Sequence, residues 1–331
     1  MDTVLVTGGA GYVGAHVCLA LSEAGFRPVV YDDLSHGHAD FVQWGPLETG
    51  DIRDGGCLDG VIARHRPRAV IHLAGLIEVG DSCRDPGPYF EINVGGALSV
   101  IAAARRGGVE VMVFSSTCAT YGDPLRLPID ETHPQAPLNP YGRSKLMVEQ
   151  ALADYGRHVG FRSVCLRYFN AAGADPEGRI GERHQPETHV IPLVMQAALG
   201  QRIGFTLFGG DYDTRDGTAV RDYVHVLDLA DAHVRALRYL LRGGEATACN
   251  LGSGAGTTVG EIVEAVRQAT GRAVPVEVAA RRAGDAASLI ADIRRAREVL
   301  DWAPRRTLED IIGSALNWHR AEGERRVLAA E

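Results

Sequence analysis

Apolar residues along the first half of the chain occur in two kinds of segment. Short continuous runs predict strands buried on both faces, as in a parallel sheet, and they occupy residues 4–7, 28–31, 69–73, 111–114 and 163–167. Longer segments with apolar positions at helical spacing lie between them, at residues 15–24, 93–106 and 141–157. This alternation predicts an α/β fold built on a doubly wound parallel sheet.

The pattern changes after about residue 170. Residues 171–188 are rich in glycine, proline and charge and predict a long loop, and further helical patterns follow at residues 191–199, 258–270 and 307–320. We therefore predict a Rossmann-type domain over residues 1–172, to which the chain returns at about 218–252, and a smaller α/β domain over 173–331. The smaller domain is expected to cap the carboxyl edge of the sheet, where ligands bind in such folds.

A glycine-rich turn joins the first predicted strand to the first predicted helix, and it contains Gly8, Gly11 and Gly14. In this context glycines let backbone N–H groups approach a pyrophosphate at the helix N-terminus, so the motif predicts dinucleotide binding. The second strand ends in Asp32 and Asp33. A carboxylate there accepts hydrogen bonds from a ribose diol and repels a 2′-phosphate, which favours NAD over NADP.

Tyr141 and Lys145 lie four residues apart in a predicted helix and therefore share one face. Asn139 and Pro140 have the residue types of an N-cap and a first-turn proline, which places Tyr141 in the first turn. A free tyrosine has a pKa near 10. Because an ammonium and the positive helix end both favour the phenolate, we expect the pKa of Tyr141 to be lowered. Tyr141 would then act as a base toward a sugar or alcohol hydroxyl.

Composition narrows the functional classes. The chain has 331 residues, of which 45% are hydrophobic and 23% charged, as in ordinary globular proteins. Its net charge of -8 argues against nucleic acid or an anionic membrane as the main partner. No apolar run reaches the roughly 18 residues of a membrane span, and the first strand begins too early for a signal peptide. Six scattered cysteines show no metal-binding spacing, so we expect free thiols, no metal and a cytoplasmic location.

Five motifs occur in an order and at a spacing that resemble those of a known family. They are residues 7–14 (TGGAGYVG), 115–122 (SSTCATYG), 140–145 (PYGRSK), 167–170 (RYFN) and 221–225 (RDYVH). In these motifs the chain is similar to the extended short-chain dehydrogenase/reductases, and within them to the UDP-glucose (UDP-galactose) 4-epimerases. The resemblance extends from Val4 to about Trp318.

The resemblance implies a reaction without net oxidation, in which NAD+ stays tightly bound and the partner is a UDP-sugar. Tyr141 would take the proton of the sugar 4-hydroxyl while C4 gives hydride to the nicotinamide. The 4-keto sugar would then present its other face before hydride returns. Lys145 would hydrogen-bond the nicotinamide ribose and lower the pKa of Tyr141, and Thr117 would bridge Tyr141 and the sugar O4.

The resemblance also implies two sets of binding residues. The cofactor set comprises Gly8, Gly11, Tyr12, Val13, Gly14, Asp32, Asp33, Asp51, Ile52, Leu73, Ala74, Gly75, Asn93, Tyr141, Lys145 and Phe169. The UDP-sugar set comprises Thr117, Tyr141, Asn170, His189, Val190, Thr206, Phe208, Arg221, Arg282, Asp285 and Leu289. Forked arginine donors suit a diphosphate, and an acidic protein must supply them locally. Arg281 could take the place of Arg282, and Asp51 could instead cap the helix that follows it.

Three positions depart from the family pattern. Ile77 stands where many family members carry a lysine, and His189 where an asparagine often contacts the substrate. Leu289 occupies a position that helps to set sugar size in the family. UDP-pentose and UDP-N-acetylhexosamine 4-epimerases, which differ only in pocket shape, therefore remain alternatives.

Functions outside the 4-epimerases fit the residues less well. A sugar-nucleotide 4,6-dehydratase needs an acid pair after the threonine, whereas Cys118 and Ala119 follow Thr117. Cys118 is interpreted as a small buried filler. A non-catalytic dinucleotide sensor would have no reason to keep Thr117, Tyr141 and Lys145 together.

The resemblance further implies a homodimer that pairs through the helices at residues 93–106 and 141–157. Their outer faces are expected to carry small or apolar residues that permit close packing, namely Ala97, Val100, Ala104, Met147 and Ala151. The alternative is that these residues face the sheet instead.

Overall fold

The computed structural model describes residues 1–282 and 285–328. Its centre is a seven-stranded parallel sheet with the order β11-β6-β5-β4-β1-β2-β3. The strands are β1 (Thr3–Thr7), β2 (Arg27–Asp32), β3 (Leu47–Thr49), β4 (Ala69–His72), β5 (Val111–Thr117), β6 (Arg162–Tyr168) and β11 (Thr247–Leu251). This is the predicted Rossmann-type sheet, and its strand order reverses between β1 and β4, where such folds bind ligands.

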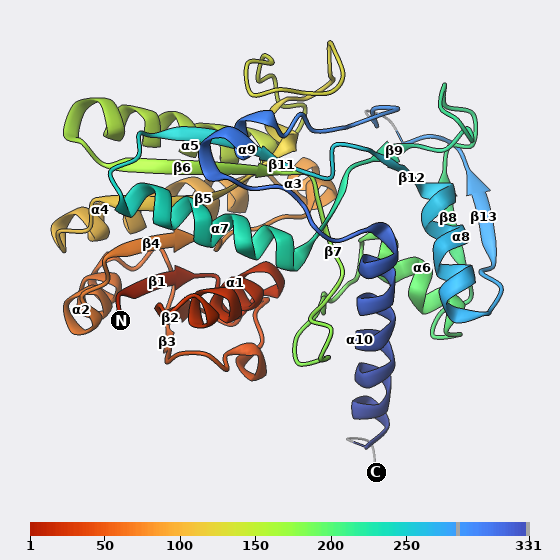
Figure 1. The fold of residues 1–331 in the computed structure, drawn as a ribbon, viewed down its shortest axis with the longest axis horizontal. Coiled ribbons are helices and arrows are strands. Elements are labelled where there is room, and N and C mark those ends of the chain that lie inside the picture. The colour runs from red at the N-terminus through yellow and green to blue at the C-terminus, as the bar shows by residue number, and fades with distance from the viewer. Residues whose placement is uncertain (283–284, 329–331) are drawn as a thin grey trace.

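Helices cover both faces of the sheet (Figure 1). Alternate residues of β1 point to opposite faces, since Val4 and Val6 belong to one apolar cluster and Leu5 to another. The first cluster packs under α1 (Tyr12–Glu23), α7 (Val226–Leu241) and α9 (Arg294–Leu300). The second packs under α2 (Gly55–His65), α4 (Ala97–Arg106) and α5 (Pro140–Val159). Burial on both faces explains why the strands read as continuous apolar runs.

The predicted helix at residues 93–106 differs from the one observed. A π-helix (Tyr89–Gly96) precedes α4, and a Cβ atom at Gly96 would collide with Ile52, so the chain passes close to its neighbour there. Ala97, Val100 and Ala104, expected on an outer face, are instead fully buried against the sheet. The expectation for these three residues is wrong, because sequence spacing alone does not say which side of a helix faces the core.

A smaller lobe lies beyond the carboxyl ends of the strands, at the right of Figure 1. Its core is formed by α6 (Val190–Ala198), α8 (Val259–Thr270) and α10 (Leu308–Leu328), with β8 (Phe205–Phe208) paired to β13 (Val276–Ala279). Two further pairs link the lobe to the sheet region, β7 (Asn170–Ala172) with β10 (Tyr223–His225) and β9 (Val220–Arg221) with β12 (Thr257–Thr258). The three predicted helices correspond to α6, α8 and α10, and the strands β8 and β13 were not predicted.

The remaining elements are short. They are the helix α3 (Val79–Arg84) and two 3-10 turns (Ala39–Phe41 and Cys118–Thr120). Residues 173–189, most of the predicted long loop, contain neither helix nor strand. Among the described residues, no helix is both long enough and apolar enough to span a membrane.

Candidate functional site

The glycine turn after β1 has a shape that only glycine permits. Gly8 has φ +75°, and a Cβ there would collide with the backbone of Ala74. A Cβ at Gly14 would overlap the carbonyl oxygen of Gly8, so α1 packs directly on the turn. Gly11 is the N-cap of α1 and supplies no side-chain cap, which leaves the first amides of the helix to bind an anion.

Asp32 and Asp33 lie where β2 ends, beside this turn. The carboxylate of Asp32 is buried and accepts the N–H groups of Ala10 at 3.0 Å and Leu34 at 2.9 Å. Burial raises the pKa of Asp32, and these two hydrogen bonds oppose the rise. Asp33 is exposed and accepts the N–H of Ser35 at 2.9 Å. Asp32 therefore braces the glycine turn from the position predicted for a ribose-binding carboxylate.

Two further cofactor candidates begin α1. Tyr12 is buried, and its hydroxyl donates to the carbonyl oxygen of Gly173 at 2.6 Å. Val13 is half-buried. Tyr12 thus ties the glycine turn to the segment that follows β7.

The loop after β4 forms the next part of the site. The N–H groups of Leu73 and Ala74 donate to the carbonyl oxygen of Thr7 at 3.0 and 3.1 Å. Asn93 holds the loop, because its side chain accepts the Leu76 N–H at 2.8 Å and donates to the Leu76 carbonyl at 3.0 Å. Its amide also donates to the hydroxyl of Ser144 at 3.0 Å. Asn93 therefore joins this loop, which includes Gly75, to α5.

Asp51 does not cap the helix that follows it. Asp54 is the N-cap of α2 and accepts the Cys57 N–H at 2.9 Å, whereas the carboxylate of Asp51 pairs with Arg53. Ile52 is buried. The alternative reading of Asp51 as a helix cap is therefore wrong.

The catalytic candidates gather at the start of α5 and the end of β5. Asn139 accepts the Gly142 N–H at 2.8 Å and Pro140 begins the helix, as predicted. Tyr141 is half-buried, and the buried Thr117, the last residue of β5, lies close enough to lower the pKa of its phenol. Lys145 is buried and donates to the Ser115 carbonyl at 3.0 Å.

Burial changes the acid–base behaviour expected for this group. It raises the pKa of Tyr141, and the nearby hydroxyl of Thr117 only partly offsets the rise. Burial also lowers the pKa of Lys145 to about 8. The expected lowering of the Tyr141 pKa by Lys145 is therefore wrong for the protein's own residues, since desolvation disfavours both charged forms.

Thr117 also caps the turn that follows β5. Its hydroxyl oxygen accepts the Ala119 N–H at 3.1 Å, and this contact leaves the hydroxyl proton available to Tyr141. Burial raises the pKa of the adjacent Cys118 thiol to about 12, so the thiol stays protonated and is a poor nucleophile.

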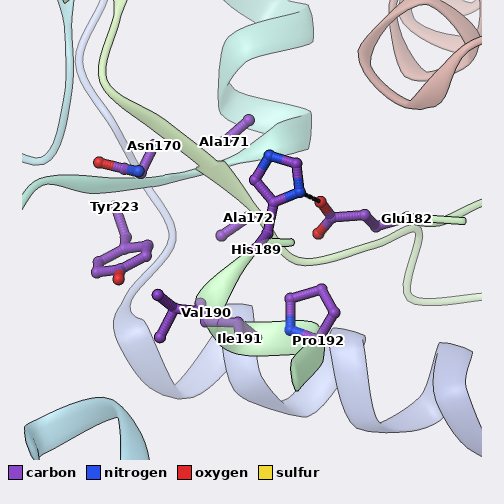
Figure 2. Close-up of a pocket in the computed structure, with 9 residues that line it drawn as sticks. All are labelled: Asn170, Ala171, Ala172, Glu182, His189, Val190, Ile191, Pro192 and Tyr223. Carbon is purple, nitrogen blue, oxygen red and sulfur yellow. Dashed lines mark ion pairs between the residues drawn. The ribbon is translucent and has the colours of Figure 1, made fainter. Parts of the chain in front are cut away.

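Three of the predicted substrate residues line one pocket, shown in Figure 2: Asn170, His189 and Val190. Asn170 begins β7, and its backbone N–H donates to the Asp222 carbonyl at 3.0 Å. The preceding Phe169 is buried against the sheet. Tyr223 completes one wall, and its buried hydroxyl has no hydrogen-bond partner among the described residues. An unpaired buried hydroxyl on a residue that lines a pocket is a group that a water molecule or another polar partner could satisfy.

The other substrate candidates lie on the smaller lobe or on the strand β9 that links it to the sheet region. Arg221 donates to the carbonyls of Val220 and Ala286, each at 2.9 Å, and lies 3.8 Å from Asp285. Leu289 is half-buried, and its N–H donates to the Val220 carbonyl at 3.1 Å. Arg221 is also close enough to Cys118 to lower the pKa of that thiol. This arginine therefore connects the lobe to the catalytic strand end.

The structure distinguishes the two neighbouring arginines. Arg282 stacks on the ring of Phe208, with 3.9 Å from the guanidinium carbon to the ring centroid. Arg281 instead pairs with Asp211 at 2.7 Å. Thr206 lies two residues before Phe208 on β8 and is half-buried. Of these two arginines, Arg282 is the one without a carboxylate partner among the residues that the structure describes, which favours it for a diphosphate.

A buried network beside the catalytic strand was not predicted. Glu149 on α5 and Arg167 on β6 form an ion pair at 2.5 Å, with side chains only 6% and 8% exposed. Ser116 donates to the same carboxylate, and Arg167 donates to the Tyr121 hydroxyl at 2.9 Å. The spacing of Glu149 from Lys145 is a helical i, i+4 relation, but nothing in the sequence links it to Arg167.

The site can now be compared with known proteins. Residues 4–252 match the family described as the NAD dependent epimerase/dehydratase family. The UDP-glucose 4-epimerase of Rhizobium leguminosarum bv. trifolii is 60% identical over 318 residues, 96% of this chain and 97% of that protein. The UDP-glucose 4-epimerase of Brucella ovis in complex with NAD has a TM-score of 0.94 and 48% identity, and 96% of this chain and 98% of that one are covered. The UDP-glucose-4-epimerase of Stenotrophomonas maltophila, with bound NAD and formylated UDP-arabinopyranose, has a TM-score of 0.96 and 38% identity, with 98% and 100% covered.

Proposed function

The chain belongs to the NAD dependent epimerase/dehydratase family, and we propose that it inverts C4 of the hexose in UDP-glucose and UDP-galactose, with NAD as its bound cofactor. The observation that carries the proposal is the group at the end of β5. There Thr117 lies close enough to Tyr141 to lower the pKa of its phenol, and Lys145 is buried one turn further along the same helix. This is the arrangement that proton removal from a sugar hydroxyl requires.

The residues present fit a dinucleotide. Because a Cβ at Gly8 or Gly14 would collide with neighbouring backbone, only glycine lets the turn pack this closely at the start of α1, and no side chain caps the first amides of that helix where a pyrophosphate would bind. Asp32 and Asp33 would hold the adenosine ribose and Lys145 the nicotinamide ribose. When bound, NAD accepts hydride from the sugar C4 and returns it.

In the proposed mechanism, Tyr141 removes the proton of the sugar 4-hydroxyl and later gives it back. Thr117 orients the phenol and relays the proton, because its own hydroxyl is held by the Ala119 N–H. Since burial raises the pKa of Tyr141, the phenolate needs positive charge close by. The positive ring of the oxidised cofactor would supply it, and Lys145 would hold the ribose of that cofactor. Without the cofactor, Tyr141 would therefore stay protonated.

The UDP-sugar would lie between the catalytic strand end and the smaller lobe. Arg221 and Arg282 would bind its diphosphate, with Arg282 already oriented by Phe208. Asn170, His189 and Val190 would contact the ligand from the pocket of Figure 2. Asp285, Thr206 and Leu289 would complete the contacts to UDP and the sugar. We also propose that the chain forms two domains, one made of residues 1–172 and 218–252 and the other made of the remaining residues.

A UDP-pentose is the second candidate substrate. The Stenotrophomonas maltophila structure, with the higher of the two TM-scores given above, holds formylated UDP-arabinopyranose. A pentose lacks only the C6 hydroxymethyl, and an apolar pocket rejects a slightly smaller ligand by about 1–3 kcal/mol, too little to exclude it. The half-buried Leu289 is intermediate in size, so UDP-N-acetylhexosamines should be turned over weakly.

The test is a panel of UDP-hexoses, UDP-pentoses and UDP-N-acetylhexosamines, with products identified by NMR. We expect UDP-glucose and UDP-galactose to have the highest kcat/KM. Tyr141→Phe should keep bound NAD and the fold but lose about 10²–10⁴ in kcat, because only the base is removed. A higher kcat/KM for UDP-xylose than for UDP-galactose would overturn the hexose assignment. Near wild-type turnover by Tyr141→Phe would overturn the mechanism.

We also propose a cytoplasmic homodimer that pairs through α4 and α5. With the buried alanines and Val100 excluded, the apolar residues left on the outer surface of these helices include Leu98 and Met147, 38% and 41% exposed. Ala151, Tyr155 and Val159 line a shallow surface hollow on α5. Sedimentation equilibrium at micromolar concentration should give the mass of two chains, and Met147→Arg should shift it toward one. A wild-type monomer would contradict the proposal.

A further inference from the structure

Four metal-ligating side chains converge in the segment between β7 and α6. They are Glu182, His184, Glu187 and His189, and one ligand atom from each lies within 4.8 Å of all the others. The carboxylates of Glu182 and Glu187 are only 7% and 8% exposed. The four residues follow one another in the sequence as Glu-x-His-x-x-Glu-x-His. The prediction of no metal site rested on the spacing of the cysteines alone and did not consider this pattern.

The distances suit a tetrahedral ion. Zinc bonds of about 2.0–2.2 Å place neighbouring tetrahedral ligand atoms roughly 3.3 Å apart. His189 Nδ1 lies 2.9 Å from Glu182 Oε1 and 3.0 Å from Glu187 Oε1. His184 Nδ1 lies 3.2 Å from Glu182 Oε1 and 3.9 Å from Glu187 Oε2. The four nitrogen–oxygen distances therefore lie on both sides of the value that an ion at their centre would impose.

Ion pairing alone explains only part of the cluster. His189 is paired with both carboxylates, and Figure 2 shows its ring directed at Glu182. The Nδ1 atom of His184 is different. It is shielded from solvent and lies 3.2 Å from Glu182 Oε1, an ion pair whose geometry falls short of a regular hydrogen bond in the described part of the chain. Two imidazoles therefore meet the same buried carboxylate, and a metal ion shared by these groups would bring them together in this way.

We propose that Glu182, His184, Glu187 and His189 bind one divalent transition-metal ion, with Zn²⁺ the best match. Two imidazole nitrogens and two carboxylate oxygens are donors that zinc accepts in four-coordinate sites, whereas Ca²⁺ prefers oxygen alone. Four protein ligands leave no open position, so the ion has a structural role.

The surroundings indicate what the ion holds together. The ring of His184 meets that of Tyr12 edge to face at 6.3 Å, which places it beside the start of α1. The backbone carbonyl of Glu182 accepts the indole N–H of Trp318 from α10 at 2.8 Å. Glu182 and His189 also line the pocket of Figure 2. The ion would therefore fasten the 173–189 segment between the glycine turn, α10 and the pocket wall.

The experiment measures metal binding directly and does not depend on the proposed activity. NAD-loaded protein is treated with a chelator, dialysed and titrated with Zn²⁺ in competition with a chromophoric chelator. We expect one Zn²⁺ per chain with a Kd below about 1 μM. Co²⁺ should occupy the same site and give the intense visible d–d bands of four-coordinate cobalt. Zn²⁺ should also raise the Tm of the wild-type protein.

Two variants test the ligands against a matched control. His184→Asn and Glu187→Gln should each weaken Zn²⁺ binding by more than about 100-fold and abolish the cobalt bands. Replacing residues that only support the metal ligands already lowers metal affinity by about 10–100-fold, so replacing a ligand should cost more. Glutamine at 187 can still accept the N–H groups of Thr188 and His189 that Glu187 now binds, which favours a folded variant. His158→Asn, which changes an exposed histidine on α5, should bind like wild type. Failure of the wild type to bind Zn²⁺ at micromolar concentration, or equal affinity in all four proteins, would refute the site.

Discussion

Replacing Glu149 by leucine should be among the most damaging changes outside the reacting residues. Leucine removes the carboxylate but leaves the guanidinium of Arg167 in a site where it is only 8% exposed. In the wild-type protein that carboxylate accepts from Arg167 Nε at 3.0 and 3.1 Å and from Nη2 at 2.5 Å. It also accepts from Gln135 at 3.1 Å and from Ser116, the neighbour of Thr117.

The expected cost follows from the charge left behind. Breaking a buried ion pair by removing one partner costs about 3–5 kcal/mol, because the remaining charge is desolvated without compensation. At an unfolding entropy of about 2.1 cal/mol/K per residue, a 331-residue chain loses roughly 6 °C in Tm for about 4 kcal/mol. The double variant Glu149→Leu/Arg167→Met removes both charges and should recover most of this loss.

The energetic coupling between Glu149 and Arg167 is measured with a double-mutant cycle. The free energies of urea unfolding are compared for the wild type, Glu149→Leu, Arg167→Met and the double variant, all at one fixed NAD concentration. We expect a coupling energy of about 3 kcal/mol or more. Activity should fall in Glu149→Leu as well, since Ser116 loses the partner that fixes the strand end. A double variant as unstable as Glu149→Leu, or a coupling energy below about 0.5 kcal/mol, would show that the buried charge is not the cause.

Three further predictions concern binding, pH and selectivity. Arg282→Ala should raise KM for UDP-galactose by about tenfold or more with little change in kcat. Arg281→Ala should leave KM near the wild-type value, because the guanidinium of Arg281 is already paired with Asp211. Equal effects of the two variants in steady-state kinetics would contradict the assignment. Burial lowers the pKa of Lys145 to about 8, so between about pH 8 and 10 the unfolded chain binds more protons and the stability of the cofactor-free protein should rise with pH. In Lys145→Met, the free energy of unfolding should rise by about 2–3 kcal/mol less than in the wild type over this pH range. The measurement is the free energy of unfolding of each protein plotted against pH, and parallel plots would refute the prediction. Leu289→Ser should raise kcat/KM for UDP-N-acetylhexosamines without a matching rise for UDP-galactose, and an unchanged ratio would show that Leu289 does not contact the sugar.

Local features of the site were predictable because neighbouring residues determine them. The glycine turn depends at Gly8 on a positive φ that glycine adopts freely, and at Gly14 on the absence of a Cβ that would overlap the Gly8 carbonyl oxygen. The start of α5 at Asn139 and Pro140 depends on one side chain accepting a backbone N–H three residues away. The parallel strands were visible because burial on both faces requires a continuous apolar run.

Properties that depend on burial or on distant partners were decided only by the tertiary structure. The pKa of Tyr141 rises because neighbouring elements exclude water from it, and residue spacing carries no information about that desolvation. Glu149 meets Arg167 across 18 positions because α5 packs on β6, and Val100 faces the sheet for a similar reason. The sequence by itself indicated which residues could perform the chemistry and where some elements begin, such as α5 at Pro140. The packing determined their charge states and partners, because electrostatic energies depend on distance and on the exclusion of solvent.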